Sequence, residues 1–508
     1  MPNTFFGLSI STSGLYAASA GLNTTSHNIS NARTEGYSRQ LIYAKADDAL
    51  RVYQQYGTIG SGVNVYQIKQ VRDEYYDVKY RQTSEKLSEN TTKRYYMYQI
   101  ENFFNEMEVD GFTEEYDSMF NALHDLKDHA EDMNYRDAAV NKFASMLDYF
   151  ASISTNLTRT QNEANLEVSN QVDRINVIAR SVATLNKQIN SIELNGGYAN
   201  DLRDQRALLL DELSEIVPIE TSEIPKGNGA NDFRVTINGQ ALVSEYDYYS
   251  LKVVTREDSI NSVDLPGLYD IEWDFGDSFH PQALSGGSLK ALFDIRDGNG
   301  NKAETYTYVD ENGVQQTGTR EAVDYKGIPY YINKINSFVD TMCKEFNKIQ
   351  AKGQDLYGNS GADNPIFVTS DGSDTFQAKT AQVNKAMSED PSLLVTTANI
   401  KEGVAGDELI DEMLALKEAK LFQNGSSKYY LQSIVGEISI DCERSSTLEE
   451  NYNTIRGTVQ NQRLSVSGVD EDEEAMNIMK YQELYELSSK MISTMQAIYN
   501  KLINETGV

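Results

Sequence analysis

The residue types that most often carry catalysis or bind metals are few in this chain of 508 residues, which has four histidines and two cysteines. His124 and His129 stand five positions apart, a spacing that turns them away from a common helix face. Cys343 and Cys442 offer neither a disulfide framework nor a zinc-binding spacing. The sequence therefore predicts no metal site and no cofactor.

Two short stretches resemble fragments of calcium-binding loops, DGNGN at 297–301 and DENG at 310–313. A complete loop spaces its ligands regularly and closes with a glutamate, which neither stretch provides. Asp, Asn and Gly also favour turns, so we predict turns at both places. The sequence contains neither a nucleophile elbow nor a glycine-rich phosphate-binding loop. We therefore expect no catalytic residues and no enzyme.

The composition narrows the classes of partner. The chain has 76 acidic and 45 basic residues, for a formal net charge of -31, and such an excess repels phosphate backbones. Its first basic residue is Arg33, which does not fit a secretory signal peptide. No stretch approaches the roughly 18 unbroken apolar residues of a transmembrane helix. We therefore expect neither nucleic acid nor a membrane as a partner, and about two to four domains.

The first residues repeat with a period of seven. Gly7, Gly14 and Gly21 are each followed by a leucine. The apolar row consists of Leu8, Leu15, Leu22 and Ile29. This period predicts a helix that packs on other helices. Each interior glycine costs about 0.8–1.0 kcal/mol relative to alanine, so we predict that residues 1–30 are disordered in the free chain and fold on assembly.

Glycines also let helix backbones approach closely. We expect the leucine row to pack on the C-terminal helix and the thin glycine face to pack on neighbouring helices.

The last residues repeat with the same period, which predicts one helix ending near Asn504. The interface positions expected there are Ile478, Tyr481, Tyr485, Ile492, Met495, Tyr499 and Leu502. The run DEDEE at 470–474 precedes this pattern, and carboxylates at a helix N-terminus complement its dipole.

Between the ends, residues 80–215 predict long helices, with one window of about 55 residues free of Pro and Gly. Residues 218–284 alternate apolar and polar, and Asn-Gly at 238–239 predicts a type I′ hairpin. Helices resume after 285, around a hairpin insert near 297–325. The expected fold is mainly α with an inserted β-rich domain. Its predicted domains are a terminal coiled coil (1–35 and 466–508), an elongated helical domain (36–217 and 285–465) and the β-rich insert (218–284).

The stretch SHNISNARTEGYSRQ at 26–40 resembles the N-terminal signature of flagellar rod, hook and hook-associated proteins. The matching positions are Asn28, Ser30, Asn31, Thr34, Gly36 and Tyr37. Residues 467–503 resemble the C-terminal helix of the same group. In between, DLRDQRALLLDELSEIV, INGQALV, GGSLKALFDIRD and FNKIQAKGQDLYG look like blocks of the flagellar hook-associated protein 1 family. The insert near 297–325 and the tyrosine-rich surface depart from that family.

The resemblance implies a structural, homo-oligomeric protein of the bacterial flagellum. Such proteins form a ring at the junction of hook and filament and are needed for filament assembly and motility. The implied partners are the hook protein below, and a second junction protein and flagellin above. The resemblance also implies export by the flagellar type III apparatus without a cleaved signal, with a chaperone on the C-terminal helix. A hook or distal rod protein, and a surface adhesin using the β-rich insert, remain alternatives.

Overall fold

The computed structural model describes residues 6–51, 57–104, 112–227, 229–309, 315–422 and 425–505. The chain divides into two units, one of residues 1–87, 173–251 and 452–508, the other of residues 88–172 and 252–451. The unit limits fall inside the helices α2 (Glu74–Phe103), α4 (Met133–Glu193) and α10 (Ser427–Ser467). The three domains drawn from the sequence have other limits and stay a prediction.

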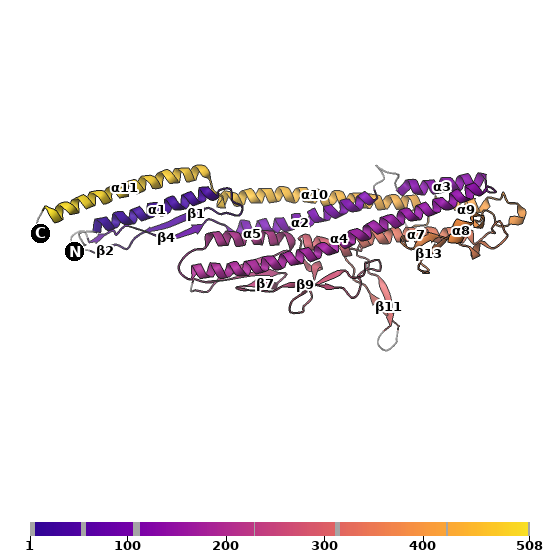
Figure 1. Ribbon diagram of the computed structural model, residues 1–508, viewed down its shortest axis with the longest axis horizontal. Helices are drawn as coiled ribbons and strands as arrows, with labels where there is room; N and C mark the ends of the chain where they lie inside the picture. The colour runs from indigo at the N-terminus through magenta and orange to yellow at the C-terminus, as the bar shows by residue number, and fades with distance from the viewer. Residues whose placement is uncertain are drawn as a thin grey trace. The chain divides into compact units, whose positions relative to one another are not determined.

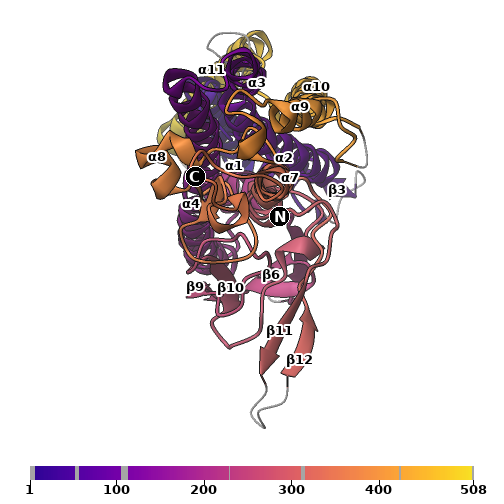
Figure 2. The ribbon, with the colours of Figure 1, turned by 90° about the vertical axis from the view of Figure 1, so that its right-hand side faces the viewer.

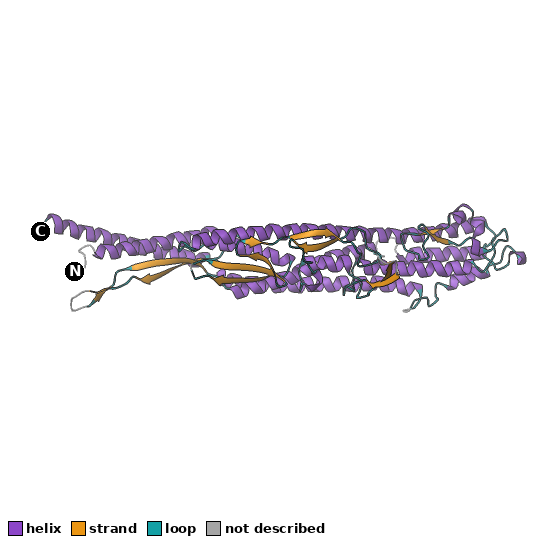
Figure 3. Cartoon of the chain, turned by 90° about the horizontal axis from the view of Figure 1, so that it is seen from below, coloured by secondary structure: helices purple, strands orange, loops and turns teal. Residues whose placement is uncertain are grey.

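The first unit contains both ends of the described chain. Helix α1 (Phe6–Asn31) and helix α11 (Glu471–Asn504) lie side by side, and strands β1 (Gln40–Ala46) and β4 (Val63–Gln70) run along α1 (Figure 1). The two strands pair antiparallel, with a bulge between Tyr43 and Ala44. A shorter pair, β2 (Leu50–Arg51) and β3 (Thr58–Ile59), extends this hairpin. Figure 3 shows these strands beside the terminal helices.

The same unit holds α5 (Asn200–Ile216) and a four-stranded sheet in sequential order. The strands are β5 (Glu220–Pro225), β6 (Asn231–Ile237), β7 (Gln240–Ser244) and β8 (Asp247–Tyr248). Asn238 and Gly239 have φ values of 51° and 82°, and Ile237 pairs with Gln240. These angles are those of a type I′ turn, so the predicted hairpin is confirmed.

The second unit is mostly helical. Its complete helices are α3 (Phe112–Asp128), α6 (Ser288–Asp297), α7 (Ile328–Gln350), α8 (Lys385–Glu389) and α9 (Glu408–Ala415), with short 3-10 turns η1 (Pro281–Ala283), η2 (Gly361–Asp363), η3 (Pro391–Leu393) and η4 (Ile400–Glu402). The core is rich in aromatic rings. Phe143 packs edge-on against Phe346 and Phe367, with centroids 5.4 Å away in both cases. Such edge-to-face pairs add to the stabilisation that burial provides.

The strands that the structure describes in this region form three antiparallel pairs. Strand β9 (Leu251–Thr255), which begins at the unit limit, pairs with β10 (Tyr269–Trp273). Strand β13 (Phe367–Thr369) pairs with β14 (Ala381–Val383). Strands β11 (Thr305–Val309) and β12 (Gln315–Thr319) form the insert, which projects from the helices of this unit (Figure 2). The mainly α fold with inserted strands is thus confirmed.

The predicted turn at 297–301 is also present, with positive φ at Gly300 and Asn301. The Asp297 carboxylate lies in the interior and accepts hydrogen bonds from Arg296 at 2.7 Å and Arg256 at 2.9 Å. Its oxygens are therefore engaged by two guanidinium groups instead of facing a loop that could hold a cation. The stretch at 310–313 lies outside the described residues.

Candidate functional site: the terminal helix pair and its joint

The glycine repeat of α1 faces α11 in antiparallel register. A Cβ atom on Gly7 would lie 3.0 Å from Met495, one on Gly14 would lie 3.1 Å from Ser488, and one on Gly21 would lie 2.5 Å from the ring of Tyr481. Each step of seven positions along α1 is matched by a step of seven back along α11. The missing side chains are what allow the two backbones to approach this closely.

This arrangement differs from the one expected from the sequence, because the glycine row, which was assigned to neighbouring helices, packs on the C-terminal helix. Ser11, Ala18 and Thr25, on the adjacent row, are buried as well. The four members of the leucine row are only half-buried, and they are Leu8, Leu15, Leu22 and Ile29. The expected place of the glycine row was wrong because it was judged by apolar area, whereas close backbone approach selects small residues. The packing of the leucine row on the C-terminal helix stays a prediction.

The α11 positions predicted for the seam are covered to different degrees. Tyr499 is buried, whereas Ile478, Tyr481, Ile492 and Met495 are half-buried. Two further seam positions, Tyr485 and Leu502, are exposed in the chain. Other exposed apolar side chains of α11 are Met476, Met479, Leu484, Leu487, Met491, Ile498 and Ile503. A large part of the apolar surface of this helix is therefore left uncovered by the described chain.

On another side of α1 lies the β1–β4 hairpin. The Ser13 hydroxyl accepts a hydrogen bond from the backbone N–H of Val63 at 3.1 Å and donates to the carbonyl of Ile10 at 2.8 Å. Gly62, with a φ of 116°, leaves no room for a side chain against Ser13. Small residues in α1 thus serve two contacts, one with α11 and one with the hairpin.

Three residues of the family signature close the loop that follows α1. The Asn28 side chain, 1% exposed, donates to the carbonyl of Gln40 and accepts from the Gln40 N–H, both at 2.9 Å. The Tyr37 hydroxyl donates to Asn28 Oδ1 at 2.8 Å and lies 2.9 Å from Nδ1 of His27. Gly36 has a φ of 76°, which a glycine adopts without strain. Burial, with nearby carboxylates, raises the pKa of Tyr37, so its hydroxyl keeps its proton.

The other three signature residues complete the end of the helix. Ser30 donates to the carbonyl of Ser26, Asn31 donates to the carbonyl of His27, and Thr34 donates to Asn31 Oδ1. These bonds are exposed and local. They are typical of Ser, Thr and Asn near helix ends, where short polar side chains compete with the backbone.

The residues that connect this loop to the rest of the unit come directly after the signature. Ser38 donates from its N–H and its hydroxyl to the two carboxylate oxygens of Asp204 on α5, at 2.9 and 2.8 Å. Arg39 donates to Glu474 at 2.7 Å and to Glu473 at 3.0 Å, in the first turn of α11. The bond to Glu473 raises the pKa of Arg39, against the opposing effect of burial.

Sequence reasoning missed Ser38, Arg39, Asp204 and Glu474. The run at 470–474 was interpreted only as a complement to the helix dipole. Its exposed carboxylates can have that role, whereas Glu474 binds Arg39. The signal that was available is the position of Ser38 and Arg39 at the end of the signature stretch. Their partners are 166 and 435 residues away along the chain, so local patterns could not identify them.

Arginine and aspartate side chains alternate in a chain of ion pairs that begins at Asp204, the partner of Ser38. Arg72 bridges Asp77 and Asp204 at 2.5 and 3.1 Å, and Arg463 of α10 bridges Asp77 and Asp211, both at 2.7 Å. Burial alone would raise the pKa of Asp77, but Arg72 and Arg463 hold it below its ordinary value. Burial does raise the pKa of Asp204, with the bonds from Ser38 opposing it. Hydrogen bonds and ion pairs therefore connect the loop after α1 to α2, α5 and α10.

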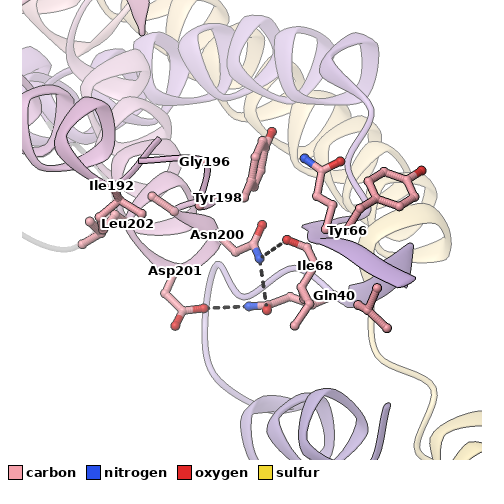
Figure 4. Close-up of a pocket in the computed structure, with 13 residues that line it drawn as sticks. Gln40, Tyr66, Ile68, Ile192, Gly196, Tyr198, Asn200, Asp201 and Leu202 are labelled. Atoms are coloured by element: carbon pink, nitrogen blue, oxygen red, sulfur yellow. Dashed lines mark hydrogen bonds between the residues drawn. The ribbon is translucent and has the colours of Figure 1, made fainter. Parts of the chain in front are cut away.

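A groove of 570 Å³ lies beside the same loop, between β4 and the start of α5 (Figure 4). Gln40 donates to Asp201 at 2.7 Å, and Asn200 donates to Gln40 Oε1 at 3.2 Å and to the carbonyl of Ile68 at 3.1 Å. Tyr66 and Tyr198 line the groove (Figure 4). The polar groups at its base bind one another, so their geometry positions the hairpin on α5.

The residues that the structure describes contain no group of three or more His, Cys, Asp or Glu side chains arranged to hold a metal ion. Within the same ranges, no helix combines the length and apolarity needed to cross a bilayer.

The terminal helix pair and the loop that carries the signature fit the axial flagellar proteins that the sequence resembles. Residues 460–505 match the model of the flagellar basal body rod FlgEFG protein C-terminal region. Residues 97–367, more than half of the chain, match the model described as flagellar hook-associated protein FlgK helical domain. The chain belongs to this flagellar hook-associated protein family.

Curated relatives agree along the full length. The chain is 27% identical to flagellar hook-associated protein 1 of Bacillus subtilis, over 100% of this chain and 99% of the relative. It is 26% identical to that of Salmonella typhimurium and 25% identical to that of Escherichia coli, over 97% of this chain and 98% of each relative. The solved structure of the flagellar hook junction protein FlgK from Burkholderia pseudomallei has the same fold, with a TM-score of 0.59 and 12% identity, over 77% of this chain and all of that one.

The chain is therefore a structural component of the bacterial flagellum, of the family that joins hook to filament. The family predicted from the signature and the middle blocks is confirmed. The alternative of a hook or distal rod protein does not fit a match to the hook-associated helical domain.

Proposed function

We propose that copies of this chain form a ring between hook and filament and contact one another through their terminal helices. The observation that carries this proposal is the uncovered apolar surface of α11, from Met476 to Ile503. Apolar surface of this extent on one helix favours burial against another helix. The glycine face is already used against α11 within the chain, so the half-buried leucine row of α1 is the second surface available to neighbouring copies.

The proposed partners follow from the place of such a ring. The hook protein lies below it, and the second junction protein and flagellin lie above it. The acidic composition, with a formal net charge of -31, supports protein partners over nucleic acid.

Before assembly the same apolar surface needs protection. We propose that an export chaperone covers α11 and that the chain leaves the cell through the flagellar type III apparatus without a cleaved signal. Residues 1–30, with glycines at 7, 14 and 21, support passage in an unfolded state, because each interior glycine weakens the helix. The protein would then act outside the cell, as a structural part and not as an enzyme.

A deletion strain tests the ring. It should assemble hooks, release flagellin into the medium and build no filament, and the gene supplied in trans should restore filaments. Labelled protein on purified flagella should appear only at the hook tip. Filaments of normal number on the deletion strain, or label along the whole hook, would contradict the proposal.

A further inference from the structure

We propose that Arg39 is a positioning latch that sets the direction in which α11 leaves α10, across a hinge at residues 468–470. The proposal rests on the proposed function, because α11 and α1 must point the same way in every copy to pack into a ring.

The hinge is the short segment between the last two helices. Helix α10 ends at Ser467 and α11 begins at Glu471. Gly468 closes α10 by donating its N–H to the carbonyl of Leu464 at 2.8 Å, and a Cβ atom there would lie 2.5 Å from that same oxygen. Asp470 begins α11 by accepting the N–H groups of Asp472 and Glu473 at 3.0 and 3.1 Å. Each helix is therefore finished on its own, so the helix hydrogen bonds do not fix the angle between them.

Arg39 contacts both sides of this hinge. Its backbone N–H donates to the carbonyl of Ser467, the last residue of α10, at 2.8 Å. Its guanidinium group donates to Glu474 at 2.7 Å and to Glu473 at 3.0 Å, both in the first turn of α11. The Arg39 side chain is 15% exposed and the Glu474 side chain only 1% exposed. One residue thus holds the end of one helix through its backbone and the start of the next through its side chain.

Arg39 is itself held from two directions. Its carbonyl accepts the N–H of Val71 at 2.7 Å, just after strand β4. Its neighbour Ser38 is bound twice to Asp204 of α5, and Asp204 is bound to Arg72. The guanidinium group is therefore fixed relative to α5 and to the hairpin that lies on α1, and α11 is directed by the position of this group.

The buried carboxylate of Glu474 favours one direction of α11 over others. Glu474 without its arginine would be a charge in a dry site, which is strongly unfavourable, whereas Glu474 in water needs no partner. Removing the guanidinium group should therefore drive the first turn of α11 outward. The pairing of α1 with α11 is also linked to the contacts of Arg39, since Arg39 binds Glu473 and Glu474 only when α11 lies in this position.

The test compares Arg39→Gln with Arg39→Lys and a matched control in full-length protein produced as the sole copy in flagellated cells. The control is Arg33→Gln, which removes the same charge from the same loop. Arg33 is 91% exposed and lies 3.7 Å from Glu471, so its pair with α11 is a solvated one. Readouts are the amount of the variant exported, filaments per cell, and filaments retained after shear.

Arg39→Gln should be exported normally, yet filaments retained after shear should fall about tenfold or more, because removing one partner of a buried ion pair is strongly unfavourable. Arg39→Lys should recover a large part of the wild-type filament retention, and Arg33→Gln should retain as many filaments as wild type. Thermal unfolding of the purified variant should keep the wild-type midpoint for the rest of the protein, because the latch acts on direction.

Equal filament retention in Arg39→Gln and wild type would overturn the latch, as would an equal loss in Arg33→Gln, or a lowered unfolding midpoint that Arg39→Lys does not restore. The deletion strain separates the two proposals. If it has no filaments while Arg39→Gln is normal, only the latch fails; if it has filaments, the junction role fails.

Discussion

At the scale of single residues, Arg136 shows how a charge is buried without a carboxylate partner among the described residues. Its guanidinium group donates to the carbonyl of Ala130 at 2.8 Å, to the carbonyl of Leu394 at 2.5 Å and to the Thr396 hydroxyl at 3.0 Å. Burial lowers the pKa of Arg136 to about 10, which still leaves it protonated at neutral pH. The side chain therefore connects the start of α4 to the segment 394–396 through oxygen acceptors.

Replacing Arg136 with methionine should lower the free energy of unfolding by about 2–4 kcal/mol, because the buried acceptors lose their donors. Urea unfolding measures the change. The matched control is Arg159→Met, since Arg159 is mostly exposed and its contact with Glu163 is 3.9 Å long. A loss in the control as large as in Arg136→Met would contradict the explanation.

The buried charges beside the loop after α1 predict that the free energy of unfolding depends on pH. The pKa of Asp77 lies below its ordinary value of 3.8 because of Arg72, with Arg463 and Arg81 adding to the effect. A carboxyl whose folded pKa is depressed contributes stability that is complete above the unfolded pKa and is lost as the pH falls through the folded one. Wild-type unfolding free energy should thus decline as the pH drops below 3.8.

Asp77→Asn should be less stable than wild type at neutral pH, and the difference between the two should shrink as the pH is lowered through that range. Urea titrations at a series of pH values measure both curves. A constant difference at every pH would mean that the carboxylate charge does not contribute.

At the scale of elements, the helices were largely predictable, because periodicity and breakers are local. The window without Pro or Gly became α4, which ends just before Gly196 with its positive φ. The C-terminal repeat became α11, ending at Asn504 as predicted. The face of α1 that meets α11 was not predictable in the same way, because a period of seven places both the glycine and the leucine rows on regular stripes.

The glycine face gives a test at this scale. Gly21→Ala should impair motility, because the new methyl group would overlap the ring of Tyr481. Gly457→Ala in α10 is the matched control, since nothing lies within 4 Å of a Cβ atom there and the change favours the helix by about 1 kcal/mol. Gly14→Leu should be exported but build no functional junction. Wild-type swimming in Gly21→Ala and Gly14→Leu would remove the packing argument.

At the scale of the whole molecule, the two terminal helices pair within one unit, and each covers the other only in part. The uncovered side of α11 and the glycines of α1 suggest that this pair is weakly stable in the free chain and gains stability when copies assemble. The other long helices, by contrast, bury aromatic and aliphatic side chains of their own.

Circular dichroism of the full-length chain and of a 35–470 truncation tests this difference. The truncation should lose less helical signal than the lengths of α1 and α11 would contribute if both were fully formed. Its main unfolding transition should be unchanged. A loss in full proportion to the residues removed would show that the pair is already folded in the free chain.

The sequence by itself determined the long helices, the terminal repeats, the inserted hairpins and the resemblance to axial flagellar proteins. All of these depend on residues close together in the chain, where period, turn chemistry and signature can be recognised. Only the tertiary structure decided which row of α1 meets α11, and that Ser38 and Arg39 bind Asp204 and Glu474. The physical reason is that a backbone approach is limited by the side chains of both helices together. A buried ion pair likewise depends on two charges meeting from distant parts of the chain, and neither charge by itself indicates its partner.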